Sequence, residues 1–168
     1  MSGAFRNPRV AFILGAVVCI ALLGYAYYLQ YVKGLEPCPL CMVQRFFFYA
    51  VMALFIVAAL HGPRRRGAAV YAALVTLFAA GGAAAASRQV WLQHLPPDKV
   101  PQCGPDLFFM LENFPLSRTW EKLFYGTGEC AKVDWTFLGL SIAGWSLVWF
   151  IALAIYAWYA ARRRQQPA

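Results

Sequence analysis

Four cysteines of this chain are spaced in a way that suits thiol–disulfide chemistry. Cys38 and Cys41 form a Cys-Pro-Leu-Cys motif, and Cys103 and Cys130 lie further along the chain. We expect the motif to open a helix, with Cys38 near the N-cap, Pro39 at the first helical position and Cys41 within the first turn. Unpaired backbone N–H groups and the positive end of the helix dipole would favour a thiolate at Cys41. This arrangement is typical of a redox-active dithiol.

Arg45 follows Cys41 by four residues, so its guanidinium is expected on the same helix face, one turn further on. A cation in that place would stabilise the thiolate and could hold an anionic partner. The alternative is an arginine that only anchors the helix at the membrane interface.

The four cysteines allow three pairings. Proximity favours Cys38 with Cys41 and Cys103 with Cys130. Closing a loop of about 28 residues would stabilise the fold by roughly 3–4 kcal/mol, whereas the small ring closed by Cys38 and Cys41 removes little entropy. We therefore expect the Cys38–Cys41 pair to serve chemistry and not stability. A zinc site with four cysteine ligands is an alternative, but such ligands usually come as two CxxC pairs. The fifth cysteine, Cys19, is expected to be an inert apolar residue inside a hydrophobic run.

The composition indicates the setting of these residues. Of the 168 residues, 61% are hydrophobic and 13% are charged, whereas a soluble domain is about 45–50% apolar and about 25% charged. A membrane-spanning helix uses about 20 apolar residues. We predict an all-α integral membrane protein, a bundle of four transmembrane helices in a single domain over 1–168, whose first span is retained. The predicted spans are 10–31, 40–60, 67–87 and 137–161.

Small residues at 79–86 would let the third span approach its neighbours closely. Charge placement then orients the bundle, because cytoplasmic segments carry an excess of Lys and Arg. Eight arginines without acidic neighbours fall in three segments: Arg6, Arg9, Arg64, Arg65, Arg66, Arg162, Arg163 and Arg164. On the other side, seven basic residues meet seven acidic ones. The net charge of +8 therefore reports topology, not nucleic-acid binding.

Both termini are accordingly expected in the cytoplasm, and loops 32–39 and 88–136 outside it, where a bacterial periplasm would oxidise the four cysteines. In the second loop, Leu116, Trp120, Leu123 and Phe124 have the spacing of a short amphipathic helix. Such a helix would lie on the membrane surface or pack on the bundle.

Taken together, these motifs resemble the disulfide bond formation protein B family over nearly the whole chain. The resemblance lies in Cys38-Pro39-Leu40-Cys41 followed by Arg45, in Cys103 and Cys130, and in the run from Gly126 to Ala131 that leads into Trp135-Thr136-Phe137-Leu138-Gly139-Leu140. Proteins of that family are bacterial inner-membrane enzymes that reoxidise the periplasmic thiol oxidase DsbA and pass the electrons to membrane quinone.

The resemblance implies a mechanism. Reduced DsbA would attack the Cys103–Cys130 disulfide at Cys103, and electrons would pass to the Cys38–Cys41 pair, with Cys130 and Cys41 as the expected bridging pair. Cys41 would deliver two electrons to ubiquinone or menaquinone, while Arg45 opposes negative charge on sulfur or on the quinone oxygen. Neither a metal nor a flavin is needed for this step.

One position departs from the family pattern. A histidine often follows the arginine before the Trp-Leu-Gln run, whereas this chain has Gln89 after Arg88. Glutamine can donate a hydrogen bond to a quinone but cannot carry a proton as imidazole does. We predict quinone contacts for Gln89 and Arg88. His94 is a possible substitute for the missing imidazole, although an exposed loop position is the simpler interpretation.

Two other functions remain open. The chain could be a specialised paralogue that serves one dedicated thioredoxin-like partner, or a structural tetraspan protein whose disulfides only brace its outer loops. The second of these would have two unreactive disulfides and no use for quinone.

Overall fold

The computed structural model describes residues 8–96, 99, 128–133 and 135–163. Four long helices make up most of this part of the chain: α1 (Pro8–Tyr31), α2 (Pro39–His61), α3 (Arg65–Gln93) and α6 (Ile142–Arg163). Each is long and apolar enough to cross a membrane. The predicted four-helix membrane fold is therefore confirmed. The predicted amphipathic helix at 116–124 and Cys103 lie outside the described residues.

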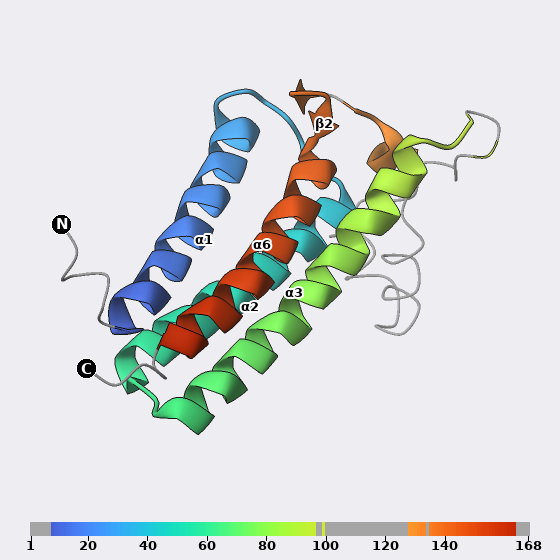
Figure 1. Ribbon diagram of the computed structural model, residues 1–168. Helices are drawn as coiled ribbons and strands as arrows, with labels where there is room; N and C mark the ends of the chain where they lie inside the picture. The colour runs from blue at the N-terminus through green and yellow to red at the C-terminus, as the bar shows by residue number, and fades with distance from the viewer. Residues whose placement is uncertain (1–7, 97–98, 100–127, 134, 164–168) are drawn as a thin grey trace, which may run out of the picture.

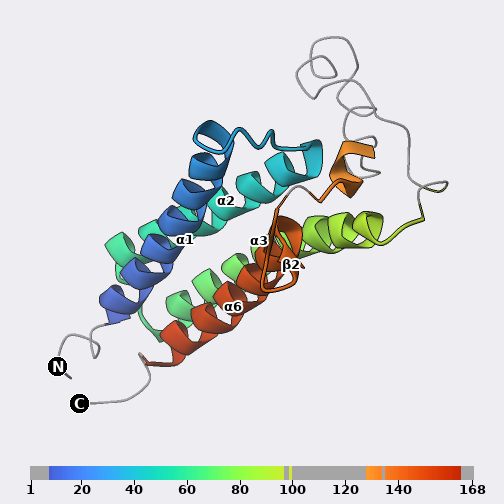
Figure 2. The same ribbon diagram turned by 90° about the horizontal axis from the view of Figure 1, so that it is seen from above.

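The four helices form a bundle in which α1 and α2 pack together and α3 packs most extensively against α6 (Figures 1 and 2). The start of α1, the α2–α3 turn and the end of α6 lie at one end of the bundle (Figure 1). That turn contains Gly62 in the left-handed conformation, φ 58°, which ends α2. The arginine-bearing segments predicted to be cytoplasmic therefore share one end, which we call the inner end, and the Cys38–Cys41 motif lies at the other, which we call the outer end.

Two boundaries differ from the prediction by five residues or more. Helix α3 continues past residue 87 to Gln93, so residues 88–93 belong to the bundle and not to the outer loop. Arg88 and Gln89 carry polar side chains, which made the apolar run seem to end early. Because Gln89 lies on the inward face, where other side chains bond it, the helix can continue through this position.

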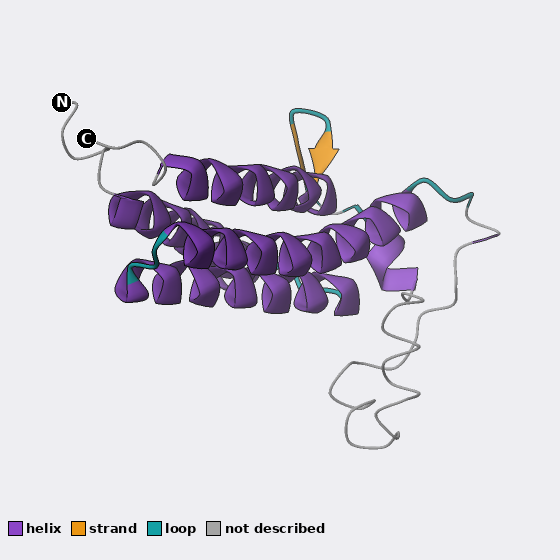
Figure 3. Cartoon of the chain, turned by 60° about the horizontal axis from the view of Figure 1, so that its bottom comes forward, coloured by secondary structure: helices purple, strands orange, loops and turns teal. Residues whose placement is uncertain are grey.

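The fourth span begins at Ile142 and not at 137, because a short antiparallel hairpin precedes it. Strands β1 (Thr136–Phe137) and β2 (Leu140–Ser141) flank a two-residue turn (Figure 3). Leu138 and Gly139 both have positive φ, 50° and 80°, as a type I′ hairpin turn requires. Ser141 then accepts a hydrogen bond at its Oγ from the Gly144 amide, 3.3 Å away, and so caps α6.

A short 3-10 helix, η3 (Gly128–Ala131), packs on α3 and on the start of α2. It brings the residues just before the hairpin onto the same end of the bundle as the Cys38–Cys41 motif. The two elements that carry described site cysteines, α2 and η3, are far apart in sequence but adjacent in space.

Candidate active site

The Cys38–Cys41 motif opens α2 as predicted. Cys38 is the N-cap residue with extended backbone angles, φ −69° and ψ 164°, and Pro39 follows at the helix start. The Cys41 amide donates to the Cys38 Sγ at 3.4 Å, and the two sulfur atoms lie 3.0 Å apart. Both residues are free cysteines in the structure. The start of α2 thus holds two sulfur atoms close enough to interconvert between a dithiol and a disulfide.

Cys130 brings a third sulfur to this place. It is fully buried in η3 and packs with Cys38, Leu40 and Leu92. Hydrogen bonding with the thiols of Cys130 and Cys41, followed by burial, raises the pKa of Cys38 above its usual range. Cys130 therefore contacts Cys38, while Cys41, the bridging partner that the resemblance implied, packs against the same cluster. The sulfur of the N-cap residue is the one that hydrogen-bonds Cys130, and the sulfur of Cys41 also borders the Gln89 amide of α3.

The amide of Gln89 contacts both sulfur atoms of the motif. Its Nε2 lies 3.3 Å from the Sγ of Cys38 and 3.3 Å from the Sγ of Cys41. Its Oε1 accepts a hydrogen bond from the Nε2 of Gln44 at 2.7 Å. Gln44 and Gln89 are 3% and 4% exposed, and they are the two buried polar side chains within the described residues. Gln89 thus neighbours both sulfurs, and its contact with quinone stays a prediction.

Arg45 lies one turn further along α2 and reaches across to α1. Its Nη1 donates to the Oε1 of Gln30 at 2.5 Å, and its Nη2 donates to the carbonyl oxygen of Ala26 at 3.2 Å. The guanidinium carbon lies 5.0 Å from the centre of the Tyr27 ring, and Tyr27 Oη is 2.8 Å from Tyr49 Oη. The charge is thus held beside the first turn of α2 by three groups of α1.

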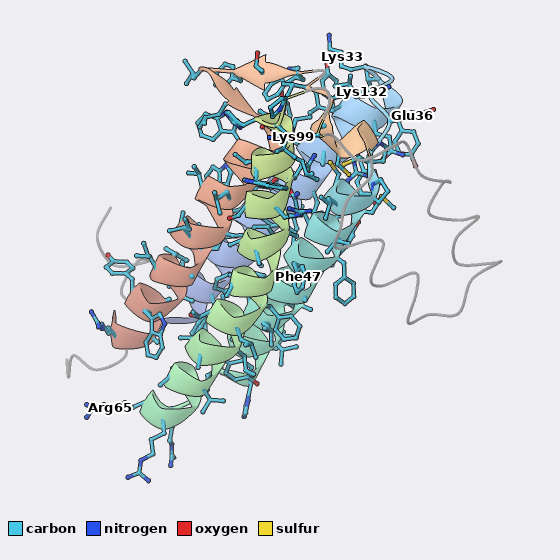
Figure 4. The ribbon with its side chains drawn as sticks, turned by 90° about the vertical axis from the view of Figure 1, so that its right-hand side faces the viewer. Lys33, Glu36, Phe47, Arg65, Lys99 and Lys132 are labelled. Carbon is cyan, nitrogen blue, oxygen red and sulfur yellow. The ribbon has the colours of Figure 1, made fainter. Side chains whose placement is uncertain are left out.

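A cavity of about 390 Å³ adjoins these residues. Cys41, Arg45 and Gln89 line it together, as do Gln44 and the exposed Glu36 of the first outer loop. Its walls are largely apolar and aromatic: Leu22, Phe48, Trp135, Trp145 and Trp149 contribute. Figure 4 shows Glu36 and Lys132, two charged residues of the lining, at the outer end of the bundle. The cavity size is that of a small-molecule site.

The sequence is similar to a known family and to proteins of several bacteria. The family model described as "Disulfide bond formation protein DsbB" matches residues 8–160. A protein of Methylococcus capsulatus named "Disulfide bond formation protein B" is 50% identical over 160 residues, which are 94% of this chain and 98% of that protein. Proteins of the same name from Hahella chejuensis (52% identical; 95% of this chain, 98% of that protein) and Nitrosococcus oceani (49% identical; 89% and 88%) are also similar.

The chain belongs to the DsbB family. This confirms the resemblance inferred from the cysteine motifs. As a DsbB-family member with four spanning helices, the chain is a multi-pass membrane protein with an oxidoreductase role in disulfide bond formation.

The remaining predicted site residues differ in where they lie. Arg88 stacks on the Trp91 ring, 4.3 Å from its centre, at the outer end of α3. It is not among the residues that line the cavity, so its quinone contact stays a prediction. His94 is exposed and forms the C-cap of α3, where its Nδ1 lies 2.8 Å from the carbonyl oxygen of Val90. His94 thus has the exposed position that was the simpler of the two interpretations of this residue.

Two residues of this DsbB-family site, Gln30 and Gln44, were not predicted to belong to it. In the sequence, Gln30 appeared only as a polar interruption of the first span, and Gln44 as a polar residue in the first turns of the second. Both are membrane-span residues that bond other polar side chains of the site. A polar residue within a span is by default a candidate functional residue, and this signal would have identified both.

Proposed function

We propose that this chain is a thiol:quinone oxidoreductase of the bacterial inner membrane that reoxidises a DsbA-like periplasmic thiol oxidase. The observation that carries this proposal is the position of Cys41. Its sulfur lies 3.0 Å from that of Cys38 and also borders a largely apolar cavity that it shares with Arg45. One sulfur of a reducible pair thus faces a small-molecule site that could be reached from lipid.

The residues of the cavity fit a quinone. Aromatic and aliphatic walls suit its ring and the start of its tail, and the guanidinium of Arg45 offers donors for its oxygens. When bound, a quinone accepts two electrons and two protons. Arg45 would oppose the negative charge that develops beside Cys41, and Glu36, which is both exposed and in the lining, could pass protons from water.

Thiol exchange supplies the electrons in steps that balance. A partner thiolate attacks Cys103, breaks its bond to Cys130 and releases the Cys130 thiolate. Because Cys130 contacts Cys38, it would attack that sulfur and release Cys41 as a thiolate. The second partner thiol then attacks the partner sulfur bound to Cys103 and releases Cys103, which attacks Cys130 and releases Cys38 from it. The partner gains a disulfide, Cys103–Cys130 is restored, and two electrons remain on the Cys38–Cys41 dithiol.

Topology forms part of the proposal. The three arginine-bearing segments would face the cytoplasm by the positive-inside rule, which places the cysteine-bearing loops in the periplasm. Labelling intact spheroplasts with a membrane-impermeant maleimide after mild reduction should modify Cys103. Labelling of Cys103 only in inverted vesicles would contradict the orientation.

The test of the activity is quinone reduction by the purified protein supplied with reduced DsbA. We expect Cys41→Ser to abolish turnover, because no second sulfur remains to complete the pair, and Arg45→Ala mainly to weaken the use of quinone. Cys19→Ala is the matched control: Cys19 is fully buried in the core of α1, and its replacement should leave turnover unchanged. Full turnover in Cys41→Ser, or unreactive disulfides in the wild type, would favour a structural role instead.

A further inference from the structure

The side-chain amide of Gln89 has two chemically different ends, and their orientation matters to the sulfurs beside it. An NH2 end donates a hydrogen bond and stabilises a thiolate, whereas a carbonyl end accepts one and can stabilise only a protonated thiol. In the structure the NH2 nitrogen lies 3.3 Å from each sulfur of the motif. The carbonyl oxygen lies 3.5 Å from the Cys41 Sγ and takes its short bond elsewhere.

That short bond comes from Gln44. The Nε2 of Gln44 donates to the Oε1 of Gln89 at 2.7 Å, and both side chains are almost completely buried. Gln44 follows Cys41 by three residues, so it lies about one helical turn further along α2. It can therefore influence the Cys41 sulfur through Gln89. Since the oxygen of Gln89 is engaged by Gln44, the NH2 group is left to face the sulfurs.

We propose that Gln44 is a positioning residue that fixes the orientation of the Gln89 amide and thereby raises the reduction potential of the Cys38–Cys41 pair. Reduction of this disulfide takes up two electrons and one proton, breaks the S–S bond, and leaves Cys38 as a thiol and Cys41 as a thiolate. A donor held against that thiolate stabilises the reduced state, which makes the disulfide a stronger oxidant. The use of this potential rests on the proposed function, but the effect itself involves only the residues of this chain.

The experiment measures the Cys38–Cys41 equilibrium of the full chain in lipid nanodiscs against glutathione redox buffers, without quinone or partner. Gln44→Met and Gln89→Met keep the side-chain length but remove the hydrogen bonds. We expect each to lower the equilibrium constant for reduction about tenfold, since a hydrogen bond to a charged group is lost, which is about 30 mV for a two-electron couple. Alkylation of Cys41 by iodoacetamide, located by mass spectrometry, should slow in parallel.

The double variant decides whether Gln44 acts through Gln89. If it does, Gln44→Met together with Gln89→Met has the potential of Gln89→Met alone. Fully additive shifts, or an unchanged potential in Gln44→Met, would overturn the proposal. A lower melting temperature with an unchanged potential would likewise show that Gln44 is only structural.

The proposed function can fail separately from this inference. Wild-type protein that does not reduce quinone, but whose potential shifts as expected in the variants, would reject quinone reduction and keep the role of Gln44. Wild-type turnover with quinone, combined with potentials that do not respond to Gln44→Met, would do the reverse.

Discussion

The two ends of this four-helix bundle are built in opposite ways. Towards the inner end, Gly15 lets an aromatic ring approach the helix backbone: a Cβ added there would lie 2.8 Å from the buried ring of Phe55. At the outer end, the same helices enclose a cavity and carry Gln44, Gln89 and Arg45. One end is filled and apolar, whereas the other is open and polar.

The difference teaches how a small membrane protein separates stability from chemistry. Close contacts between small and large residues stabilise helix association in lipid, where burial of apolar surface contributes little. Polar groups in a membrane must find partners within the protein. Here those partners lie at the outer end, where the bundle leaves space for a ligand. Changes of the same kind should therefore have different consequences at the two ends.

The largest effect is expected for Gly15→Leu. Its side chain would enter the space of the Phe55 ring, which is fully buried, with the centre of the Phe12 ring 6.4 Å away and that of the Tyr156 ring 6.3 Å away. Overpacking of this kind costs about 1–3 kcal/mol or more. We expect little folded protein, measured as the monomer recovered in detergent and as its melting temperature.

Gly24→Leu is the matched control for this change. Gly24 also lies within a spanning helix, but a side chain added there would meet nothing within 4 Å. Its variant should be recovered like the wild type. Equal yields of the two variants would show that the inner end is not filled as described.

A comparable enlargement at the outer end should affect function and not folding. Ser146 of α6 is half-buried and lines the cavity, so Ser146→Phe would place a ring in that space. Loss of about 1.4 kcal/mol of quinone binding corresponds to a tenfold change, and we expect the KM for quinone to rise by at least that factor. The melting temperature should change little. A large loss of stability here would remove the contrast between the two ends.

Two arginines near the outer end offer a sharper comparison. Arg45 and Arg88 each lie over an aromatic ring, at 5.0 Å from that of Tyr27 and 4.3 Å from that of Trp91, but Arg45 lines the cavity and Arg88 does not. Arg45→Gln should lower kcat/KM for quinone about tenfold, because a charge-assisted contact is lost. Arg88→Gln should lower it less than about twofold. Equal losses would place Arg88 at the quinone site, as the sequence suggested.

The sequence predicted the filled end of the molecule better than the open one. The length of an apolar run and the placement of arginines are properties of whole segments. The four spans, and the end of the bundle at which α1 starts and α6 ends, could therefore be inferred without knowledge of tertiary contacts. The position of Cys38 at the N-cap was also predictable, because Pro39 and the CxxC spacing are local signals.

What could not be predicted depends on residues that are far apart in the chain. Nothing in the sequence around Cys130 indicates that η3 brings its thiol into hydrogen-bond contact with Cys38. The pairing of Gln44 with Gln89 joins positions 45 residues apart. The hairpin before α6 was missed because its residues are apolar like the span that follows, although Gly139 was a turn signal.

The smallest effect is expected for Gln30→Leu, which removes one of the groups that hold Arg45. The guanidinium would keep the carbonyl oxygen of Ala26 at 3.2 Å and the ring of Tyr27, so its charge would stay near the cavity but with more freedom. The variant removes one hydrogen bond that fixes the position of the guanidinium and leaves its charge in place. We therefore expect the KM for quinone to rise about threefold with little change in kcat. Quinone titration at saturating reduced partner measures this. If Gln30→Leu lowered kcat/KM for quinone as much as Arg45→Gln, Gln30 would itself have to contact the quinone. The polar groups of the ligand site would then come from α1 as well as from α2 and α3.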